Sequence, residues 1–307
     1  MELRDITDDL HSALAQHGFR SVIVSVAHVP ELRKTIERGR AGGLIHDAVC
    51  KQYADYFEDM LSQDLAWADS IIAVAVPQPM LEVVFTVDGK RRPVIIPPTY
   101  EHTVDEAVTK LVTGVLAPHG HEIRRATLPR KLLAAHSGLA RYGKNNIAYV
   151  EGMGSFHRLL AFYTDLPCVQ DTWQDPQMLE ACDGCTACVK RCPTGAIDPD
   201  QFQLRAERCL TLHNESSEPF PAWIDESWHH CLVGCMKCQQ CCPVNREVGS
   251  WTERFAEFTD EESALILSGV SESGLPEHVR SKFKNTDLLD DPAALARNLV
   301  SVLTATG

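Results

Sequence analysis

The chain has 307 residues, a net charge of −13 at neutral pH and a hydrophobic content of 44%. That is enough for one large domain or two ordinary ones with packed cores. The acidic balance argues against nucleic-acid binders, which need clustered lysines and arginines. The N-terminus is charged rather than apolar, and no run of about eighteen apolar residues occurs. We expect a soluble protein of the reducing cytoplasm, without a membrane partner.

Helical and strand patterns alternate along the first half of the chain. Leu10 and Leu14 belong to an apolar repeat at helical spacing that ends at Gly18. Asp88-Gly89 is a favoured turn pair between two short strands, which predicts a hairpin. The expected helices cover 3–17, 53–68 and 104–116, and the expected strands cover 21–26, 71–76, 83–87, 93–96 and 159–166.

The second half of the chain divides into an irregular region and a helical one. Residues 176–249 hold most of the cysteines and few long periodic segments. From Trp251 onward the pattern is helical, with a helix beginning at Asp291-Pro292. Its buried stripe is expected to contain Leu295, Leu299, Val300 and Leu303. The fold class is therefore α/β (α+β), with domain boundaries near 175 and 249.

Ten of the twelve cysteines lie between Cys182 and Cys242, and eight of these ten form two runs that each end in Cys-Pro. The first run has the C-x2-C-x2-C-x3-C-P spacing of a bacterial two-cluster ferredoxin and ends at Cys192-Pro193. Three thiolates on one short loop can bind three corners of a cubane, and the cysteine before proline reaches the other cluster. Zinc takes only four ligands and would leave about half of these cysteines unused. The pattern predicts two [4Fe-4S] clusters.

The crossover rule assigns the ligands of the two clusters. The first cluster takes Cys182, Cys185, Cys188 and Cys242, and the second takes Cys192, Cys209, Cys235 and Cys238. The last ligand could be Cys209, Cys231 or Cys241. We favour Cys209, because the other two lie beside ligands, where a second bond to the same cubane is awkward. Cys231 and Cys241 are then expected to be small buried residues near a cluster.

A segment upstream of the cysteines makes the pattern more specific. It reads Ser137-Gly-Leu-Ala-Arg-Tyr-Gly-Lys-Asn-Asn146 and is followed by Gly154-Ser-Phe156 and Thr164-Asp-Leu166. Together with the cysteine runs, it resembles the epoxyqueuosine reductases, cobalamin-dependent iron–sulfur enzymes of tRNA modification. Their corresponding segment is Gly-Leu-Gly-Trp-Ile-Gly-Lys-Asn, followed by Gly-Ser and Thr-Asp-Leu. The reductive dehalogenases are more distantly similar.

The resemblance implies an architecture and a cofactor. It implies a nitroreductase-like, corrinoid-binding domain over 1–175, a double [4Fe-4S] ferredoxin-like domain over 176–249 and a helical extension over 250–307. Cob(I)alamin is a strong reductant, so its cobalt must be supplied by low-potential centres, and [4Fe-4S] clusters reach that range. The expected electron donor is a protein of the ferredoxin or flavodoxin type.

The chain departs from this family at the proton donor. The family's aspartate lies in a Val-Asp-Ser-Ala-Pro segment, where this chain reads Ile123-Arg-Arg-Ala-Thr-Leu-Pro129 and has Arg124 in place of the acid. An arginine stays protonated and is a poor general acid. The family also continues into tRNA-contacting helical repeats beyond the length of this chain. Together with the acidic balance, these differences predict that epoxyqueuosine is not the substrate and that tRNA is an unlikely partner.

The basic segment 122–144 and one histidine supply the other candidate residues. Gly138, Gly143, Lys144 and Asn145 are expected to face the cofactor, and the alternative is an ordinary turn that ends a helix. Arg124 and Arg141 could bind a carboxylate or phosphate with paired hydrogen bonds. His102 could donate a proton during reduction, although one histidine among thirteen is more often structural.

Two functions from different classes follow. The first is an iron–sulfur oxidoreductase whose clusters feed low-potential electrons to a cobalamin-type cofactor that reduces a small anionic substrate. The second is an electron-transfer or activase protein that reduces the corrinoid or flavin of a partner. A flavin in the nitroreductase-like domain is a further alternative. The basic segment favours the first, and loss of the family's acid favours the second.

Overall fold

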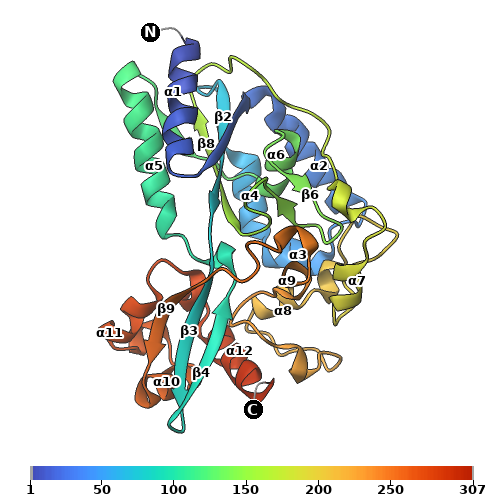
Figure 1. The fold of residues 1–307 in the computed structure, drawn as a ribbon, viewed down its shortest axis with the longest axis vertical. Helices are drawn as coiled ribbons and strands as arrows, with labels where there is room; N and C mark the ends of the chain where they lie inside the picture. The colour runs from blue at the N-terminus through green and yellow to red at the C-terminus, as the bar shows by residue number, and fades with distance from the viewer. Residues whose placement is uncertain (1–2, 306–307) are drawn as a thin grey trace. The chain divides into compact units, whose positions relative to one another are not determined.

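The structure is a computed structural model that describes residues 3–305. The chain forms two compact units, which can be followed by colour along the chain in Figure 1. The first unit comprises Met1–Pro77, Thr103–Cys185 and Pro199–Gln203, and the second comprises Gln78–His102, Thr186–Asp198 and Leu204–Gly307. Each unit has a sheet and a core of its own.

A four-stranded antiparallel sheet with the order β1-β2-β8-β5 forms the centre of the first unit. Its strands are β1 (Arg20–Ser25), β2 (Ser70–Pro77), β5 (Ile123–Arg125) and β8 (His157–Thr164). Successive side chains of a strand point to opposite faces, so β2 contributes to two cores. Ile71 and Ala73 enter one core, and Ile72 and Val74 enter the other. This double burial explains the uninterrupted apolar run of β2.

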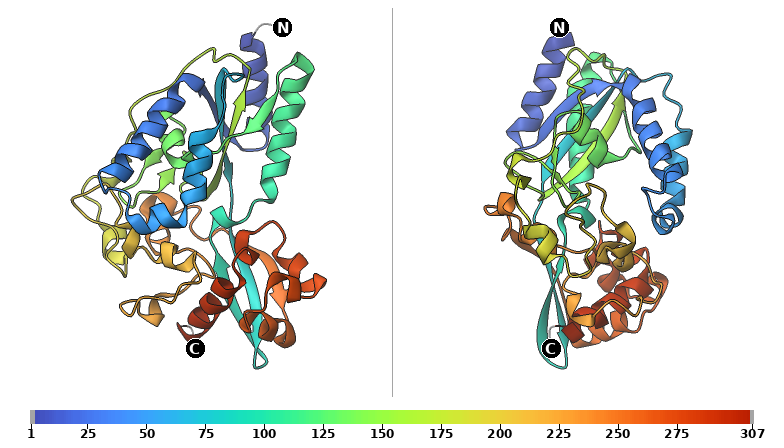
Figure 2. Two further views of the ribbon diagram at one scale, coloured as in Figure 1. Left: turned by 180° about the vertical axis from the view of Figure 1, so that it is seen from behind. Right: turned by 90° about the vertical axis from the view of Figure 1, so that its right-hand side faces the viewer.

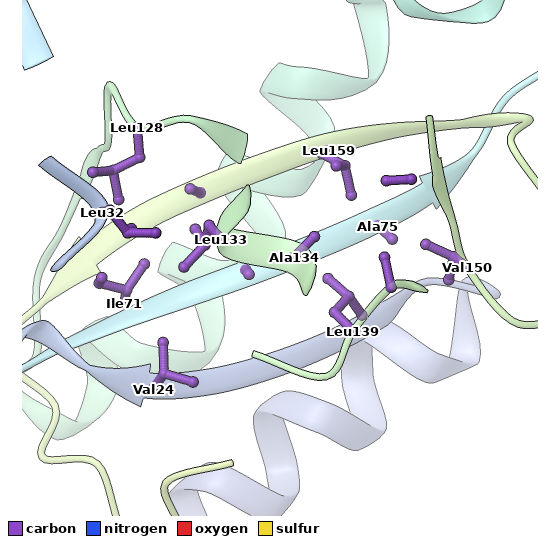
Figure 3. Close-up of a cluster of buried hydrophobic side chains, with 14 of the residues drawn as sticks. Val24, Leu32, Ile71, Ala75, Leu128, Leu133, Ala134, Leu139, Val150 and Leu159 are labelled. Atoms are coloured by element: carbon purple, nitrogen blue, oxygen red, sulfur yellow. The ribbon is translucent and has the colours of Figure 1, made fainter. Parts of the chain in front are cut away.

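Helices cover both faces of this sheet, as the two views in Figure 2 show. One core lies under α1 (Leu3–Gln16) and α5 (Thr103–Leu116), whose buried residues repeat at helical spacing. The opposite core, drawn in Figure 3, includes side chains of α2 (Val29–Ala41) and α6 (Arg130–His136). The remaining elements of the unit are α3 (Asp47–Gln52), α4 (Ala54–Ser62), β6 (Arg141–Tyr142) and β7 (Ala148–Tyr149).

The structure contains most of the elements predicted for the first unit. The helices over 3–17 and 104–116 and the strands over 21–26, 71–76 and 159–166 are present. The prediction of one helix over 53–68 is wrong in its second half, because α4 ends at Ser62. A turn replaces the missing part, and in it the Asp64 carboxylate accepts a hydrogen bond from the Ala66 N–H at 3.1 Å.

A three-stranded sheet with the order β4-β3-β9 supports the second unit. Its strands are β3 (Met80–Val87), β4 (Lys90–Ile96) and β9 (Thr252–Phe258). β3 and β4 form the predicted hairpin, in which Asp88 and Gly89 have φ values of 52° and 69°. Two successive left-handed residues are what a two-residue turn of type I′ requires, and glycine adopts that conformation most easily.

Strand β9 corrects the expectation that the chain is helical from Trp251 onward. β9 pairs in parallel with β3, about 170 residues earlier in the chain. Phe258 lies between Phe85 of β3 and Phe283, with ring centroids at 5.0 and 4.8 Å. The buried apolar side chains of the segment belong to a core that combines β3 with the C-terminal helices. The local sequence therefore carried little strand signal.

The rest of the second unit is helical or irregular. Helices α7 (Ala187–Arg191), α8 (Leu210–Asn214), α9 (Lys237–Gln240), α10 (Asp260–Leu267), α11 (Glu277–Arg280) and α12 (Pro292–Ala305) follow along the chain. The predicted helix at Asp291-Pro292 is α12. Its predicted stripe is wrong at Val300, which is 50% exposed, whereas Asn298 is buried. The Asn298 amide donates to the carbonyls of Asn214 and Leu232 at 2.8 and 3.0 Å, so a polar residue fills this core position.

The two compact units divide the chain differently from the predicted domains. The hairpin β3–β4 was expected within the first 175 residues but belongs to the second unit, because β3 pairs with β9. The short segment Pro199–Gln203 belongs to the first unit, although it lies within the predicted cluster domain. Among residues 3–305, no helix is long and apolar enough to cross a bilayer.

A buried carboxylate joins α5 to the central sheet. Asp105 accepts hydrogen bonds from Arg158 of β8 at 2.5 and 2.8 Å and from Arg125 of β5 at 2.6 Å. Burial alone would raise the pKa of Asp105, but the hydrogen bonds from Arg158 and Arg125 outweigh it and hold the pKa below its ordinary value. The ionised carboxylate is therefore part of the folded structure.

Replacing Asp105 by Asn should lower the free energy of unfolding by about 3 kcal/mol at neutral pH, because Arg158 and Arg125 lose their anion. The contribution of Asp105 is fully present above the unfolded pKa of about 3.9 and is lost as the pH falls through the lower folded pKa. Anaerobic thermal melts across this range should show the two curves converging in acid. Asp9→Asn, on the exposed side of α1, is the control, and equal stability of Asp105→Asn and wild type at neutral pH would contradict the account.

Candidate active site beside the iron–sulfur motif

A short hairpin of the first unit holds the loop that was predicted to face a cofactor. Strands β6 and β7 pair with Arg141 opposite Tyr149. The turn between them is closed by a hydrogen bond from the Gly143 N–H to the Ile147 carbonyl at 2.8 Å, and Asn146 has a φ of 60°. Lys144 and Asn145 therefore lie in a tight hairpin turn rather than in a helix-ending turn.

Main-chain hydrogen bonds join this hairpin to the segment that precedes the cysteines. The Tyr142 N–H donates to the Gln177 carbonyl, and the Leu179 N–H donates to the Tyr142 carbonyl, both at 2.8 Å. The buried Tyr142 ring lies edge-on to Phe202 at 5.0 Å between centroids. The hairpin thereby fixes the path of the chain into the first cysteine run.

Lys144 makes two direct contacts with the first cysteine run. Its backbone N–H donates to the Cys182 Sγ at 3.4 Å, and its Nζ donates to the Cys185 carbonyl at 3.0 Å. Hydrogen bonds to cluster sulfurs and nearby charge are among the features that set the potential of an iron–sulfur centre. Lys144 can therefore tune the potential of a cluster ligated by Cys182.

The glycines and the asparagine of this segment have internal partners. A Cβ at Gly143 would lie 2.6 Å from both the Asn145 Oδ1 and the Tyr149 ring, and one at Gly138 would lie 2.7 Å from Gln174 Nε2. Gly138 also has a φ of 78°, in the left-handed region. The Asn145 amide is buried and donates to the Tyr149 hydroxyl at 2.9 Å. Packing within the first unit thus accounts for these residue types.

Arg124 and Arg141, the predicted anion-binding residues, lie in the first unit and are exposed. The Arg141 guanidinium is 3.2 Å from Glu180. Arg124, on the edge strand β5, lies 3.6 Å from Glu122 and stacks over the Trp67 ring at 4.2 Å. Glu122 and Trp67 thus fix the Arg124 side chain, which places a cation where the resemblance predicts an acid.

His102, the predicted proton donor, belongs to the second unit. Its Nε2 lies 3.3 Å from the Asp287 carboxylate, and its backbone N–H donates to the Asn285 carbonyl at 2.9 Å. Tyr100, two residues earlier, donates to the Glu215 carboxylate. These contacts give His102 a structural function within its unit, and its catalytic role remains a prediction.

The cysteines predicted for the second cluster all belong to the second unit. Burial raises the pKa of the Cys209 thiol, and the neighbouring Cys192 raises it further. Burial, with Cys209 and Cys192 nearby, raises the pKa of Cys235 to about 12. The raised pKa values of Cys209 and Cys235 suit a cationic iron–sulfur core, which supplies the positive charge that their thiolates need. This donor set therefore fits the predicted second cluster.

A neutral histidine adjoins this thiol group. Burial lowers the pKa of His230 to about 4, so the ring is uncharged at neutral pH. Its Nε2 accepts from the Met236 N–H at 3.1 Å and lies 4.0 Å from the Cys235 Sγ, so the proton resides on Nδ1, which faces the Trp228 carbonyl at 3.1 Å. His230 carries no signal in the sequence, because its contact with Cys235 depends on the fold.

The remaining cysteines are divided between the units. Cys182 and Cys185 belong to the first unit, whereas Cys188 and Cys242 belong to the second. Cys231 is fully buried, which raises its pKa well above the ordinary value, and the Cys241 Sγ donates to the Cys238 carbonyl at 3.5 Å. No three His, Cys, Asp or Glu side chains among residues 3–305 are placed to hold a single metal ion. In a cubane each thiolate binds a different iron, so its ligands stand further apart.

His157 presents an unpaired acceptor beside the hairpin. Burial lowers its pKa to about 4, and its Nε2 donates to the Ala148 carbonyl of β7 at 3.1 Å. The ring is therefore neutral with its lone pair on Nδ1, and this buried atom has no partner in the described part of the chain. A buried acceptor of this kind is satisfied by an N–H or O–H group from outside the polypeptide, either of a bound water or of a ligand.

Comparison with known proteins identifies the cysteine region first. Residues 181–245 match the 4Fe-4S double cluster binding domain. The two predicted [4Fe-4S] clusters are thus confirmed as a domain, while the eight individual ligands remain predictions.

Parts of the chain are similar in sequence to one group of enzymes. It is 30% identical over 142 residues to an epoxyqueuosine reductase of Francisella cf. novicida, covering 44% of this chain and 38% of that protein. It is 26% identical over 231 residues to the Staphylococcus aureus enzyme, covering 72% of this chain and 59% of that protein. The predicted resemblance is confirmed. The chain nevertheless spans less than two thirds of the length of these relatives.

Solved structures of epoxyqueuosine reductases have the same fold. The Bacillus subtilis enzyme, solved with its catalytic loop swung out of the active site, matches with a TM-score of 0.72 at 18% identity, covering 99% of this chain and 82% of that one. An epoxyqueuosine reductase with an epoxyqueuosine-modified tRNA-Tyr stem loop matches with a TM-score of 0.69 at 18% identity and the same coverage. The predicted mixed α/β fold class is confirmed.

The second of these structures corrects one expectation. The acidic balance of the chain was among the features that predicted tRNA to be an unlikely partner. That prediction is wrong, since a protein of the same fold was solved with a tRNA stem loop bound. Net charge averages over the whole surface and does not exclude a local binding face for phosphates.

Replacing Cys209 by Ala should remove the second cluster and lower the iron content from about eight to about four atoms per chain. Cys209 lies apart from both cysteine runs, so its replacement is the sharpest test of the predicted set of cluster ligands. Anaerobic iron analysis and the spectrum of the reduced protein measure the loss. Cys168→Ala, outside the motif, and Cys241→Ala should both keep the full iron content. Full iron in Cys209→Ala would show that another cysteine is the ligand.

Replacing Lys144 by Gln should lower the reduction potential of one cluster by about 60 mV, or about tenfold in the equilibrium of a one-electron couple. The lost ammonium no longer favours the electron-rich state, while the backbone N–H to Cys182 remains. An EPR-monitored redox titration separates the two clusters. Lys131→Gln removes a charge that contacts Asn146 of the same turn and should shift neither potential. Unchanged potentials in Lys144→Gln would contradict the assigned role.

Proposed function

We propose that this protein is an iron–sulfur oxidoreductase whose two [4Fe-4S] clusters pass low-potential electrons to a cobalamin-type cofactor, which reduces an anionic substrate. One observation carries the proposal. Lys144, in the loop predicted to face the cofactor, contacts Cys182 and Cys185 of the first cysteine run. A cofactor held by this loop would lie next to the cluster that reduces it, as electron transfer requires. The reducing cytoplasm is the proposed compartment.

The residues around the hairpin suit a corrinoid. A corrin ring bears amide side chains that can donate hydrogen bonds, and the unpaired Nδ1 of His157 is a buried acceptor beside β7. Lys144 and Arg141 can contact amide oxygens or a phosphate from the turn. When bound and reduced, cobalamin would supply a strong reductant, and the chain's own residues would hold it and exclude water.

The proposed anionic substrate has support from a group of arginines in the first unit. Arg125 and Arg158 share the carboxylate of Asp105. Arg130 has no ion-pair partner among the described residues, and its Nη1 donates only to the Leu159 carbonyl at 3.1 Å. Burial, and then the charge of Arg158, lowers the pKa of Arg130. An anion near Arg130 would offset both the cost of its burial and its repulsion by Arg158. The three arginines share one carboxylate, so the group favours an anionic ligand.

The anion has two possible sources. Because relatives of the same fold include one solved with a tRNA stem loop, it can be an RNA phosphate as well as a small carboxylate or phosphate. Epoxyqueuosine itself is not the proposed substrate, since Arg124 cannot supply the proton that an opening epoxide needs. Binding of a tRNA stem loop and reduction of epoxyqueuosine are thus separate questions.

The second candidate function is an electron-transfer or activase protein that reduces a partner's corrinoid or flavin. It is favoured by the internal packing of Gly138, Gly143 and Asn145, which leaves fewer groups to hold a cofactor. In that case the clusters would be present, but the first unit would carry no organic cofactor of its own.

Uptake of cob(II)alamin distinguishes these functions. Anaerobically purified protein with both clusters should bind cob(II)alamin at about one per chain, seen as a change in its EPR spectrum. His157→Phe keeps the size of the ring but removes the acceptor and should weaken binding by about tenfold, or about 1.4 kcal/mol. His119→Phe, on an exposed turn, is the control. Intact clusters with no uptake would favour the electron-transfer function.

Turnover separates the substrate classes. With cobalamin bound and a chemical reductant present, we expect no reduction of an epoxyqueuosine-modified stem loop above background. Binding of the same stem loop, measured by fluorescence anisotropy, should weaken in Arg130→Gln and not in Lys131→Gln if the anion is an RNA phosphate. Rapid turnover of epoxyqueuosine would contradict the proposed substrate and leave the electron relay intact.

A further inference from the structure

Two short helices of the second unit carry both cluster ligands and basic side chains. α7 contains Cys188 and ends with Lys190 and Arg191, and α9 begins with Lys237 and contains Cys238. The two helices pack against each other. Their cysteines are predicted to ligate different clusters, so the pair lies close to both.

The three cations form one basic surface, which we call the α7–α9 patch. Lys190 and Arg191 are exposed and Lys237 is half-buried. Because α7 and α9 pack against each other, the cations at the end of α7 and at the start of α9 belong to the same part of the second unit.

No carboxylate neutralises the α7–α9 patch. Within residues 3–305, Lys190, Arg191 and Lys237 form no ion pair. Two other arginines of the cluster region have internal partners. Arg205 pairs with Asp198 at 2.7 Å, and Arg208 donates to the Thr194 carbonyl at 2.8 Å. The three cations of the patch are therefore available to an outside partner.

We infer that the α7–α9 patch is the docking surface for an acidic, low-potential electron-carrier protein of the ferredoxin or flavodoxin type. The inference rests on the proposed function, because it requires clusters that accept electrons. One electron would leave the reduced carrier and reduce one oxidised cluster, and no bond would form or break.

Charge and position favour this partner. A protein with a net charge of −13 repels an acidic carrier unless a local basic surface guides the encounter. The patch lies on the helices that hold Cys188 and Cys238, where the path from carrier to cluster is short. Val244, 37% exposed in the turn after α9, offers an apolar contact of the kind found at the centre of interfaces. An RNA backbone could also use the cations but would gain nothing from the clusters beneath them.

The test uses the full chain with both clusters and measures cluster reduction by stopped-flow absorbance. The reductants are a reduced bacterial flavodoxin and the small methyl viologen radical. With flavodoxin, the rate for the wild type should fall as salt rises. Lys190→Glu/Arg191→Glu should be slowed at least about tenfold at low salt and lose most of that salt dependence. Its rate with viologen should equal that of the wild type.

Two further variants keep the test decisive. Lys34→Glu/Lys51→Glu, on exposed positions of the first unit, changes the net charge equally and should leave the flavodoxin rate unchanged. Lys190→Gln/Arg191→Gln removes the two charges without reversing them and should lower the flavodoxin rate by a smaller factor. This variant provides the test if Lys190→Glu/Arg191→Glu does not retain its clusters.

Four results would overturn the inference. The first is a flavodoxin rate in Lys190→Gln/Arg191→Gln equal to that of the wild type, and the second is equal slowing in the Lys34→Glu/Lys51→Glu control. The third is an unchanged flavodoxin rate with lost binding of a tRNA stem loop, which would make the patch an RNA surface. The fourth is reduction of the wild type by viologen but not by flavodoxin, which leaves the proposed function standing. Failure of both reductants would instead overturn the proposed function together with the inference.

Discussion

The contact between the β6–β7 turn and the first cysteine run is the feature on which the functional account depends. A hydrogen bond from the Lys144 N–H to the Cys182 Sγ joins a loop of the first unit to the start of the double-cluster motif. The tightness of the turn at Gly143 and the main-chain pairing of Tyr142 fix that geometry. Electron transfer depends steeply on distance, so a rigid junction of this kind is what a relay from cluster to cofactor needs.

Charge balance is the second constraint on the molecule. Buried thiols at Cys209 and Cys235 resist ionisation, so the fold of this region needs the positive charge of an iron–sulfur core. In the first unit the imbalance has the opposite sign, because Asp105 compensates two of three arginines and leaves Arg130 without an anion. The first imbalance fits the double-cluster domain, and the second supports the proposed anionic ligand.

The sequence predicted the parts of the structure that depend on local pattern. Helical periodicity located α1 and α5, the Asp88-Gly89 pair located the hairpin β3–β4, and cysteine spacing identified the double-cluster domain. Strand β9 was missed because its partner β3 is distant in the chain. The unpaired acceptor of His157 was also out of reach, since the sequence cannot show which polar atom the fold leaves without a donor.

The central claim is that a cluster and a corrinoid lie next to each other in the folded protein. The most direct test is the spin relaxation of bound cob(II)alamin, measured by pulsed EPR before reduction and in partly reduced protein that holds reduced clusters and still shows the cob(II)alamin signal. The account predicts that reduction of the adjacent cluster makes it paramagnetic and speeds the relaxation of the cobalt spin strongly. Relaxation that is the same with oxidised and reduced clusters, in protein that holds both clusters and cobalamin, would contradict the account.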